Sequence, residues 1–300
     1  MKYKPKLNLA EKIETLFNNK ISKIILIFLI IFYLLVAILN SLNMCNFIQS
    51  QFLSKTPLLI ISIIFMITTL YIVDKGISVI SRTSNILFYI GFTLLILSFI
   101  GLIPAFEYDN FKPFFTSSIT DYSIGLNSFY AYNILPMFLL TMIPKDCFKN
   151  PKIKKTLFIS YIVSAISIFF IVFQTIATFG YELANLYEYP EFFVLKHVVL
   201  VNLSSRVESI LIIQLLFDIF IYNIFLIYFT SNCIKTLFEV KKIKFIYLIV
   251  CVLVVVSTVF ISKYNIYLDD LIINEIPIII SAFVSLLIII IYIKIKMSKK

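Results

Sequence analysis

Eight long, nearly uninterrupted apolar stretches constrain this chain more than any other feature. A helix needs about 20 residues to cross the hydrocarbon core of a bilayer, and each stretch is close to this length. They cover residues 22–43, 57–73, 84–104, 124–143, 155–179, 206–230, 243–262 and 273–294. A membrane β-barrel would instead show segments of about ten residues with alternating polarity. The stretches therefore predict an all-α, polytopic helical membrane protein with about eight transmembrane helices.

The composition favours the same class and excludes a soluble protein. Hydrophobic residues make up 61% of the chain and charged residues only 14%. Soluble domains carry about 25% charged residues. So few charges cannot cover a water-facing surface, and lipid must cover most of it.

The net charge of +10 could suggest a nucleic-acid partner, but the positions of the basic residues indicate a membrane orientation instead. Of the 26 Lys and Arg residues, all except five lie in the two termini, in alternate loops between the apolar stretches, or at the edges of the stretches that adjoin these segments. The exceptions are Lys55, Lys112, Lys196, Arg206 and Lys263. Because cytoplasmic segments carry the excess of Lys and Arg, both termini are predicted to be cytoplasmic, next to anionic lipid. No nucleic-acid partner is expected.

The predicted organisation has three parts. Residues 1–21 form a cytoplasmic amphipathic segment, residues 22–294 the helical transmembrane domain, and residues 295–300 a basic cytoplasmic tail. Apolar residues recur at helical spacing in the first part, which predicts a short helix on the membrane surface. These residues are Leu7, Ala10, Ile13, Leu16 and Phe17.

Motifs of catalytic chemistry are absent from the sequence. There is no glycine-rich phosphate loop, no H-E-x-x-H and no G-x-S-x-G. The four cysteines do not have the spacing of metal ligands. We therefore predict that the protein is not an enzyme and has no cofactor and no metal site.

One ionisable residue, Asp218, lies deep within an apolar stretch. Gln214 precedes it by four residues and Tyr222 follows it by four, so the three share one helical face. A charge inside the membrane costs at least about 2.5 kcal/mol, so it normally faces a cavity or a partner. Two interpretations stay open, a ligand or polar pathway and a structural hydrogen bond between helices.

The stretch 124–143 is the most polar at its outer half. Its polar residues are Asn127, Ser128, Tyr130, Tyr132 and Asn133. Pro136 follows them and is expected to kink the helix, because proline removes a backbone hydrogen bond. The polar group predicts either a ligand site or the interfacial start of a helix. Ser281 and Ser285 in the last stretch are expected to serve helix packing, with substrate contact as the alternative.

Several motifs occur in an order and spacing that resemble a known family. Thr56-Pro57 opens the second stretch, and Gly76 to Arg82 follow it. Arg206-Val207-Glu208 leads into a long helix, and Met142-Ile143-Pro144 closes the stretch 124–143. Together these resemble the spore germination receptor B-subunit family, a branch of the amino acid–polyamine–organocation (APC) superfamily.

The resemblance implies a fold and a setting. The family has ten spans in two five-helix inverted repeats, like the leucine transporter, and this chain would lack the first two. Where the family tends to have Gly-x-Glu in a broken helix, this chain has Ala131-Tyr132-Asn133. The resemblance also implies a nutrient ligand, typically an amino acid, together with A-type and lipoprotein C-type partner subunits. The setting would be the inner membrane of a bacterial spore.

Three functions remain open at this stage. The leading one is a membrane subunit of a germinant receptor that senses a small nutrient. The alternatives are an amino-acid permease of the APC superfamily and a degenerate subunit that only assembles with partners. The candidate ligand residues are Asn127, Ser128, Tyr130, Ala131, Asn133, Gln214, Asp218 and Tyr222.

Overall fold

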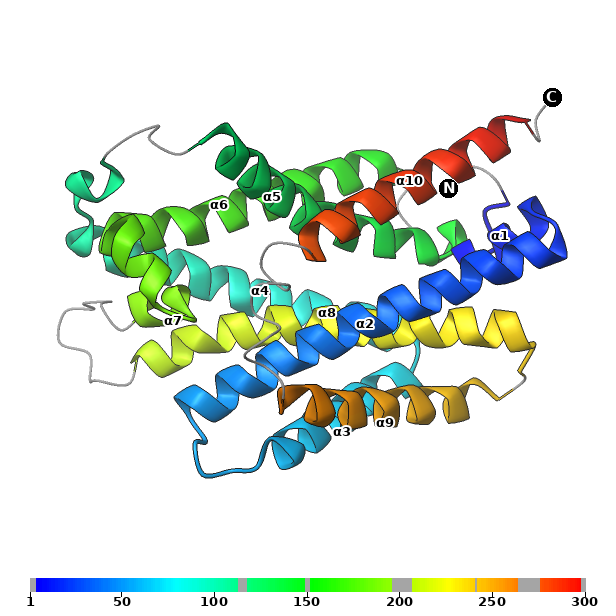
Figure 1. Ribbon diagram of the computed structural model, residues 1–300, viewed down its shortest axis with the longest axis horizontal. Helices are drawn as coiled ribbons and strands as arrows, with labels where there is room; N and C mark the ends of the chain where they lie inside the picture. The colour runs from blue at the N-terminus through cyan, green and yellow to red at the C-terminus, as the bar shows by residue number, and fades with distance from the viewer. Residues whose placement is uncertain are drawn as a thin grey trace. The chain divides into compact units, whose positions relative to one another are not determined.

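The computed structural model describes residues 4–112, 118–148, 152–195, 207–240, 242–263 and 276–297 (Figure 1). The side chains of Tyr132, of residues 207–212 and of residues 276–277 are not described. The α-helices are α1 (Leu9–Leu16), α2 (Asn19–Gln51), α3 (Leu58–Asp74), α4 (Ile77–Leu102), α5 (Ile119–Leu139), α6 (Ile153–Leu186), α7 (Pro190–Leu195), α8 (Val207–Phe238), α9 (Ile243–Ser262) and α10 (Ile276–Met297). Short 3₁₀ turns follow α4 and α5: η1 (Ile103–Ala105), η2 (Tyr108–Phe111), η3 (Leu140–Met142) and η4 (Lys145–Cys147). These described residues contain no β-strand.

Each of the eight predicted apolar stretches contains an α-helix. In the described part of the chain, six helices are long and apolar enough to cross a membrane: α2, α4, α6, α8, α9 and α10. Helix α3 is equally apolar but has only 17 residues. Helix α5 carries polar residues through its first half, which lowers its mean hydropathy. The chain is thus an all-α polytopic membrane protein, and α3 and α5 as seventh and eighth spans remain a prediction.

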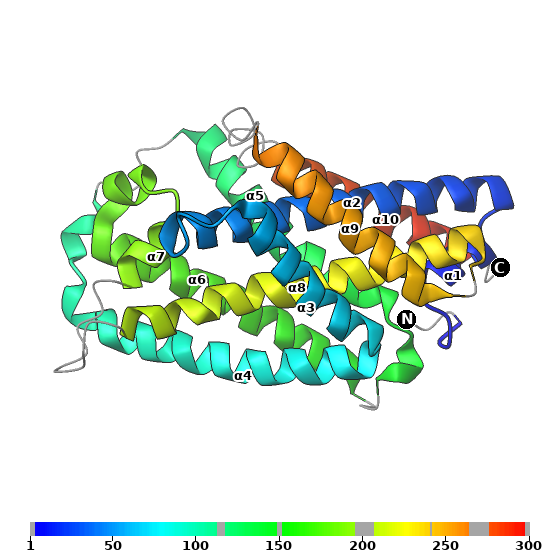
Figure 2. The same cartoon turned by 90° about the horizontal axis from the view of Figure 1, so that it is seen from below.

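The chain divides into two compact units. Unit 1 comprises residues 1–80, 119–155 and 222–300, and unit 2 comprises residues 81–118 and 156–221. In unit 1, α9 lies against α2 and α3, and α5 lies against α10 (Figures 1 and 2). The core of this unit is formed largely by α2 and the second half of α8, whose buried apolar side chains include Leu29, Tyr33, Ile224 and Phe229.

A buried polar contact joins α2 to α8 within unit 1. The Asn223 amide nitrogen donates to the Ser41 hydroxyl at 2.7 Å, and that hydroxyl donates to the Ala37 carbonyl oxygen at 2.6 Å. The Asn223 and Ser41 side chains are fully buried. Because an unpaired buried amide is costly, this contact fixes the register of the two helices.

The amphipathic helix of the N-terminal segment is present as α1, but its apolar face is covered by protein. Leu9, Ala10, Ile13 and Leu16 are buried, and α1 contacts α2, α10 and η3. An Asn8 capping box begins the helix: Asn8 Oδ1 accepts from the Glu11 amide and Glu11 Oε2 accepts from the Asn8 amide, both at 2.9 Å. The sequence predicted a helix that lies on the membrane surface, but in the structure the apolar face of α1 packs against protein.

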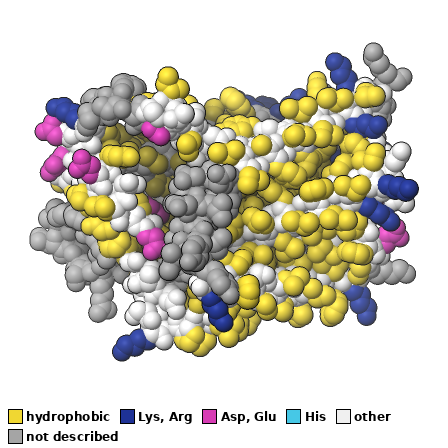
Figure 3. Space-filling view, viewed as in Figure 1, with side chains coloured by type: hydrophobic (Ala, Val, Ile, Leu, Met, Phe, Trp, Pro, Cys, Tyr) yellow, Lys and Arg dark blue, Asp and Glu magenta, His cyan; other side chains and the backbone are white. Residues whose placement is uncertain are grey.

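The basic segments of unit 1 meet at one of its ends. The Lys145 amide donates to the Pro5 carbonyl oxygen at 2.9 Å, and Lys294 Nζ lies 5.9 Å from the centre of the Phe17 ring. Lys244 Nζ pairs with Asp74 Oδ2 at 2.9 Å, which joins the start of α9 to the end of α3. Figure 3 shows Lys and Arg side chains gathered where α1 and the C-terminal turns of α10 lie.

Unit 2 contains most of α4 and α6, α7 and the first half of α8. Phenylalanines from the end of α4 and from the turns after it pack against α6: Phe99, Phe106 and Phe111 contact Phe170 or Phe173. The helical backbone of α6 is interrupted at Gly180, which has φ 73° and ψ 171°. This break was not predicted from the sequence.

Candidate functional site

The polar face of α5 is hydrogen-bonded to the serine pair of α10 within unit 1. The Ser281 hydroxyl donates to Asn127 Oδ1 at 2.8 Å, and the Tyr130 and Ser285 hydroxyls lie 3.1 Å apart. Because Asn127 pairs with Ser281 and Tyr130 with Ser285, the two helices run parallel here. The serines thus join the two helices, the packing role expected of them.

Asn133 is the most deeply buried of the α5 candidates, with 2% of its surface exposed. Its amide nitrogen donates to the Phe129 carbonyl oxygen of its own helix at 2.9 Å. Its Oδ1 atom is buried and has no hydrogen-bond partner among the described residues, and the same is true of Asn127 Nδ2. This part of α5 therefore offers one unused acceptor and one unused donor.

The other α5 candidates differ from one another in their burial. Ala131 is buried and Ser128 is half-buried, while the Tyr132 side chain lies outside the described residues. The backbone is helical through Ala131-Tyr132-Asn133, so the position where a broken helix was anticipated is regular. Helix α5 continues through Pro136 and ends three residues later at Leu139, where η3 begins.

The three candidates on α8 have different surroundings. Gln214 is 7% exposed and faces Gly91 of α4, where an added Cβ would lie 3.7 Å from Gln214 Cγ. Asp218, one turn later, is exposed in the isolated chain, and Tyr222 is half-buried. Gln214 and Asp218 belong to unit 2, whereas Tyr222 and all the α5 candidates belong to unit 1.

The motif residues have local structural roles where they are described. Pro57 precedes the first residue of α3, and the Thr56 carbonyl oxygen accepts from Gln49 Nε2 at 2.9 Å. Gly76 has φ 81°, which a side chain would strain, and Arg82 is exposed on α4. Arg206 and the Glu208 side chain lie outside the described residues.

Sequence reasoning missed the two hydrogen bonds that lie next to the break in α6. The Ala177 carbonyl oxygen, one turn before Gly180, accepts from the Glu107 amide and from Asn110 Nδ2, both at 2.9 Å. The scarcity of glycine in the chain could have drawn attention to Gly180. Nothing in the sequence, however, indicated that Asn110, 67 residues away along the chain, would reach this helix.

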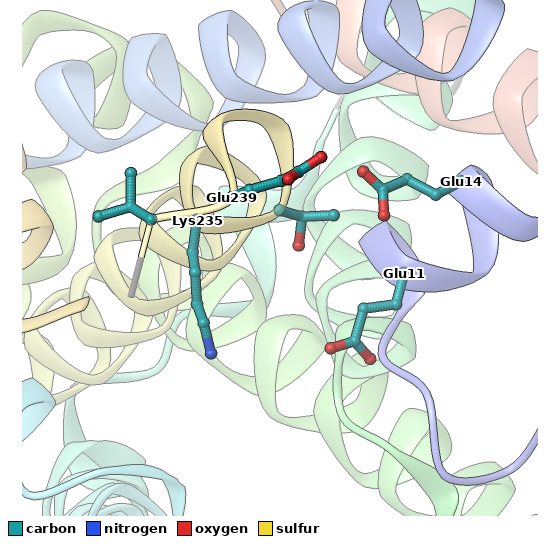
Figure 4. Close-up of a pocket in the computed structure, with 6 residues that line it drawn as sticks. Glu11, Glu14, Lys235 and Glu239 are labelled. Atoms are coloured by element: carbon teal, nitrogen blue, oxygen red, sulfur yellow. The ribbon is translucent and has the colours of Figure 1, made fainter. Parts of the chain in front are cut away.

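A pocket of about 450 Å³ lies between α1 and the end of α8 in unit 1 (Figure 4). Three carboxylates and one amine line it, from Glu11, Glu14, Glu239 and Lys235, together with Thr236 and Val240. Burial raises the pKa of Glu14, and the neighbouring carboxylates of Glu239 and Glu11 raise it further, while Lys23 opposes them.

The backbone at Glu239 is unusual. Helix α8 ends in a Schellman motif, in which the Val240 amide donates to the Lys235 carbonyl oxygen at 3.2 Å. The residue that must adopt the left-handed conformation in this motif is usually glycine, but here it is Glu239 with φ 52°. A carboxylate at a helix C-terminus also opposes the helix dipole. In the described part of the chain no three His, Cys, Asp or Glu side chains are placed to hold a metal ion.

Comparison with known proteins identifies the family. A sequence model of the family described as spore germination protein matches residues 1–266. No curated protein and no solved structure matches the chain. The matched segment spans α1 to α9 and includes the α5 polar face and the whole of α8. The chain therefore belongs to the spore germination protein family.

Proposed function

We propose that this protein is the membrane subunit of a spore nutrient-germinant receptor, which senses a small nutrient and signals germination through partner subunits. Membership of the spore germination family supports a role in germination. The observation that carries the sensing role is the pair of unused polar atoms on α5, Asn133 Oδ1 and Asn127 Nδ2.

These two atoms have the chemistry that an amino acid requires. An amide oxygen accepts a hydrogen bond from an ammonium group, and an amide nitrogen donates to a carboxylate. Buried polar groups normally have partners, so an unpaired acceptor and an unpaired donor in one helix favour a polar ligand. We infer that the nutrient is zwitterionic, with an amino acid as the simplest case.

The same family membership leads us to infer partner subunits, an A-type membrane subunit and a C-type lipoprotein. We place the protein in the inner membrane of the spore. The basic end of unit 1, with its Lys145–Pro5 and Lys294–Phe17 contacts, supports cytoplasmic positions for both termini because cytoplasmic segments carry excess Lys and Arg.

A substitution of Asn133 tests the sensing role. In the spore-forming host, Asn133→Leu removes the unused oxygen, and we expect the rate of amino-acid-induced germination to fall at least about tenfold, as for one lost buried hydrogen bond to a charged group. Asn232→Leu is the matched control, since Asn232 makes the same bond to its own helix, Nδ2 to the Tyr228 carbonyl oxygen at 2.7 Å. An unchanged response to every amino acid in Asn133→Leu would contradict the proposal.

One observation favours a second candidate, a subunit that only assembles with its partners. Two of the polar side chains of α5 are engaged by Ser281 and Ser285, and α5 has no break at Ala131-Tyr132-Asn133. The two candidates differ in one measurement. Both kinds of subunit would co-purify with an A-type subunit. A sensing subunit would also show a thermal shift with an amino acid, whereas an assembly subunit would show none.

A further inference from the structure

The buried face of α1 contains a charged residue, Lys12, among its apolar side chains. Lys12 is 6% exposed, and its neighbours on that face are Leu9, Ile13 and Leu16. The described residues contain two ion pairs, Lys112–Asp109 and Lys244–Asp74, and Lys12 takes part in neither. The Lys12 side chain is therefore largely buried and has no ion-pair partner among these residues, which is unfavourable for a charged group.

The adjacent carboxylates of α1 are directed elsewhere. Glu11 accepts the hydrogen bond of the capping box from the Asn8 amide, and both Glu11 and Glu14 line the pocket at the end of α8 (Figure 4). At 100° per residue, Glu14 lies about 160° around the helix from Lys12, and Glu11 about 100°. Burial lowers the pKa of Lys12, and Glu11 only partly opposes this.

A second cation lies close to the same helix. Lys294, in the last turn of α10, lies over the ring of Phe17, the C-cap residue of α1. Phe17 is five residues from Lys12, about 7.5 Å along a helix axis. Helix α1 also contacts α10, so Lys12 and Lys294 belong to two helices that pack against each other.

The surroundings of these lysines are those of a membrane interface. Helix α2 begins directly after α1, and its exposed apolar residues near this end include Ile24, Ile27, Phe28 and Ile31. Helix α10 likewise exposes Ile289, Ile290 and Ile293 below Lys294. Two apolar surfaces therefore run from the basic group into the bilayer, as the acyl chains of a phospholipid require. A free phosphate would make no use of them.

We propose that Lys12 and Lys294 bind the headgroup phosphate of an anionic phospholipid, whose acyl chains lie along α2 and α10. The lipid neutralises the buried amine and joins α1 to the end of α10. This site is separate from the α5 polar face and does not depend on the proposed germinant role. Basic sites between helices on the cytoplasmic side are a general mode of lipid recognition.

Native mass spectrometry of the purified full chain tests the site. With phosphatidylglycerol added, we expect one retained lipid per chain, and Lys12→Gln or Lys294→Gln should each weaken its binding about tenfold, the loss of one charge-assisted contact. Lys12→Arg should retain the lipid. Lys55→Gln, which changes an exposed lysine in the loop between α2 and α3, is the matched control and should bind as the parent protein does.

Three outcomes would overturn the proposal. Equal retention of phosphatidylcholine would show that the anionic charge is not recognised. Unchanged phosphatidylglycerol binding in both Gln variants would remove the two lysines from the site. Displacement of the lipid by millimolar inorganic phosphate alone would show a free-anion site. Because Lys294→Gln changes a side chain outside the buried face of α1, it keeps the test decisive if Lys12→Gln fails to fold.

Discussion

Replacement of Gly180 by alanine tests the most specific backbone feature of unit 2. Gly180 has φ 73° and ψ 171°, a region that is essentially restricted to glycine and costs other residues about 1–3 kcal/mol. A Cβ there would also lie 3.4 Å from Asn110 Oδ1, the side chain whose nitrogen donates to the Ala177 carbonyl oxygen. We therefore expect Gly180→Ala to lower the free energy of unfolding by about 1–3 kcal/mol.

The assay is thermal unfolding of the purified protein in detergent. The entropy of unfolding is about 2.1 cal/mol/K per residue, or about 0.6 kcal/mol/K for 300 residues, so Gly180→Ala should lower Tm by roughly 2–5 °C. Gly125→Ala is the matched control, because Gly125 lies inside α5 with nothing within 4 Å of an added Cβ. Alanine is the better helix former, so this variant should keep or raise Tm. Equal Tm values for the two variants would refute the role of Gly180.

Three further predictions concern unit 1, all measured by the same thermal unfolding unless stated. Glu239→Gly should raise the free energy of unfolding by about 1 kcal/mol, because glycine adopts the left-handed conformation without strain; a lower Tm would contradict this. Ser41→Ala should lower the free energy of unfolding by about 1–3 kcal/mol, because it leaves the buried Asn223 amide unpaired. Adding Asn223→Leu should recover part of this loss, whereas an additive loss would argue against the contact. The pKa of Glu14 is raised in the native state, so the native state binds more protons than the unfolded chain. Docking of α1 should therefore be strongest at or below pH 4.5, the ordinary pKa of a glutamate. It should weaken as the pH rises through the raised pKa. Hydrogen exchange of the α1 amides, corrected for the intrinsic rate, should show this loss of protection, and a gain of protection with rising pH would contradict it.

The helical architecture could be predicted from the sequence because membrane insertion depends on local composition. An apolar stretch can be identified without knowing which helix it packs against, and each of the eight stretches contains a helix in the structure. The boundaries were less accurate where polar residues continue a helix beyond the apolar part. Helix α2, for example, extends to Gln51, eight residues beyond the predicted end at residue 43.

The candidate site could be predicted only in part from the sequence. The polar composition of the stretch 124–143 placed Asn127, Tyr130 and Asn133 on one helix, but it could not show which atoms are paired. The pairing with Ser281 and Ser285 joins positions 154 and 155 residues apart. Spacing alone also grouped Gln214 with Asp218, although one is buried and the other exposed, because burial depends on neighbouring helices.

The environment of α1 shows the same limit. Its amphipathic pattern predicted the helix correctly, whereas the identity of the surface that covers the apolar face is a tertiary property. A lipid surface and a protein surface accept the same pattern of apolar residues. The buried position of Lys12 could not be inferred from that pattern either, because lysine normally indicates an exposed face.

The central claim, that this family member senses a nutrient through the polar face of α5, is tested most directly by ligand-dependent thermal stability. The purified chain would be heated with each of the twenty amino acids, in parallel with Asn133→Leu and the control Asn232→Leu. A ligand present at 100 times its Kd stabilises the native state by about 2.7 kcal/mol. We predict a rise in Tm of several degrees with at least one amino acid in the parent protein and in Asn232→Leu, and none in Asn133→Leu. The same rise in Asn133→Leu, or no rise in the parent protein with any amino acid, would contradict the claim.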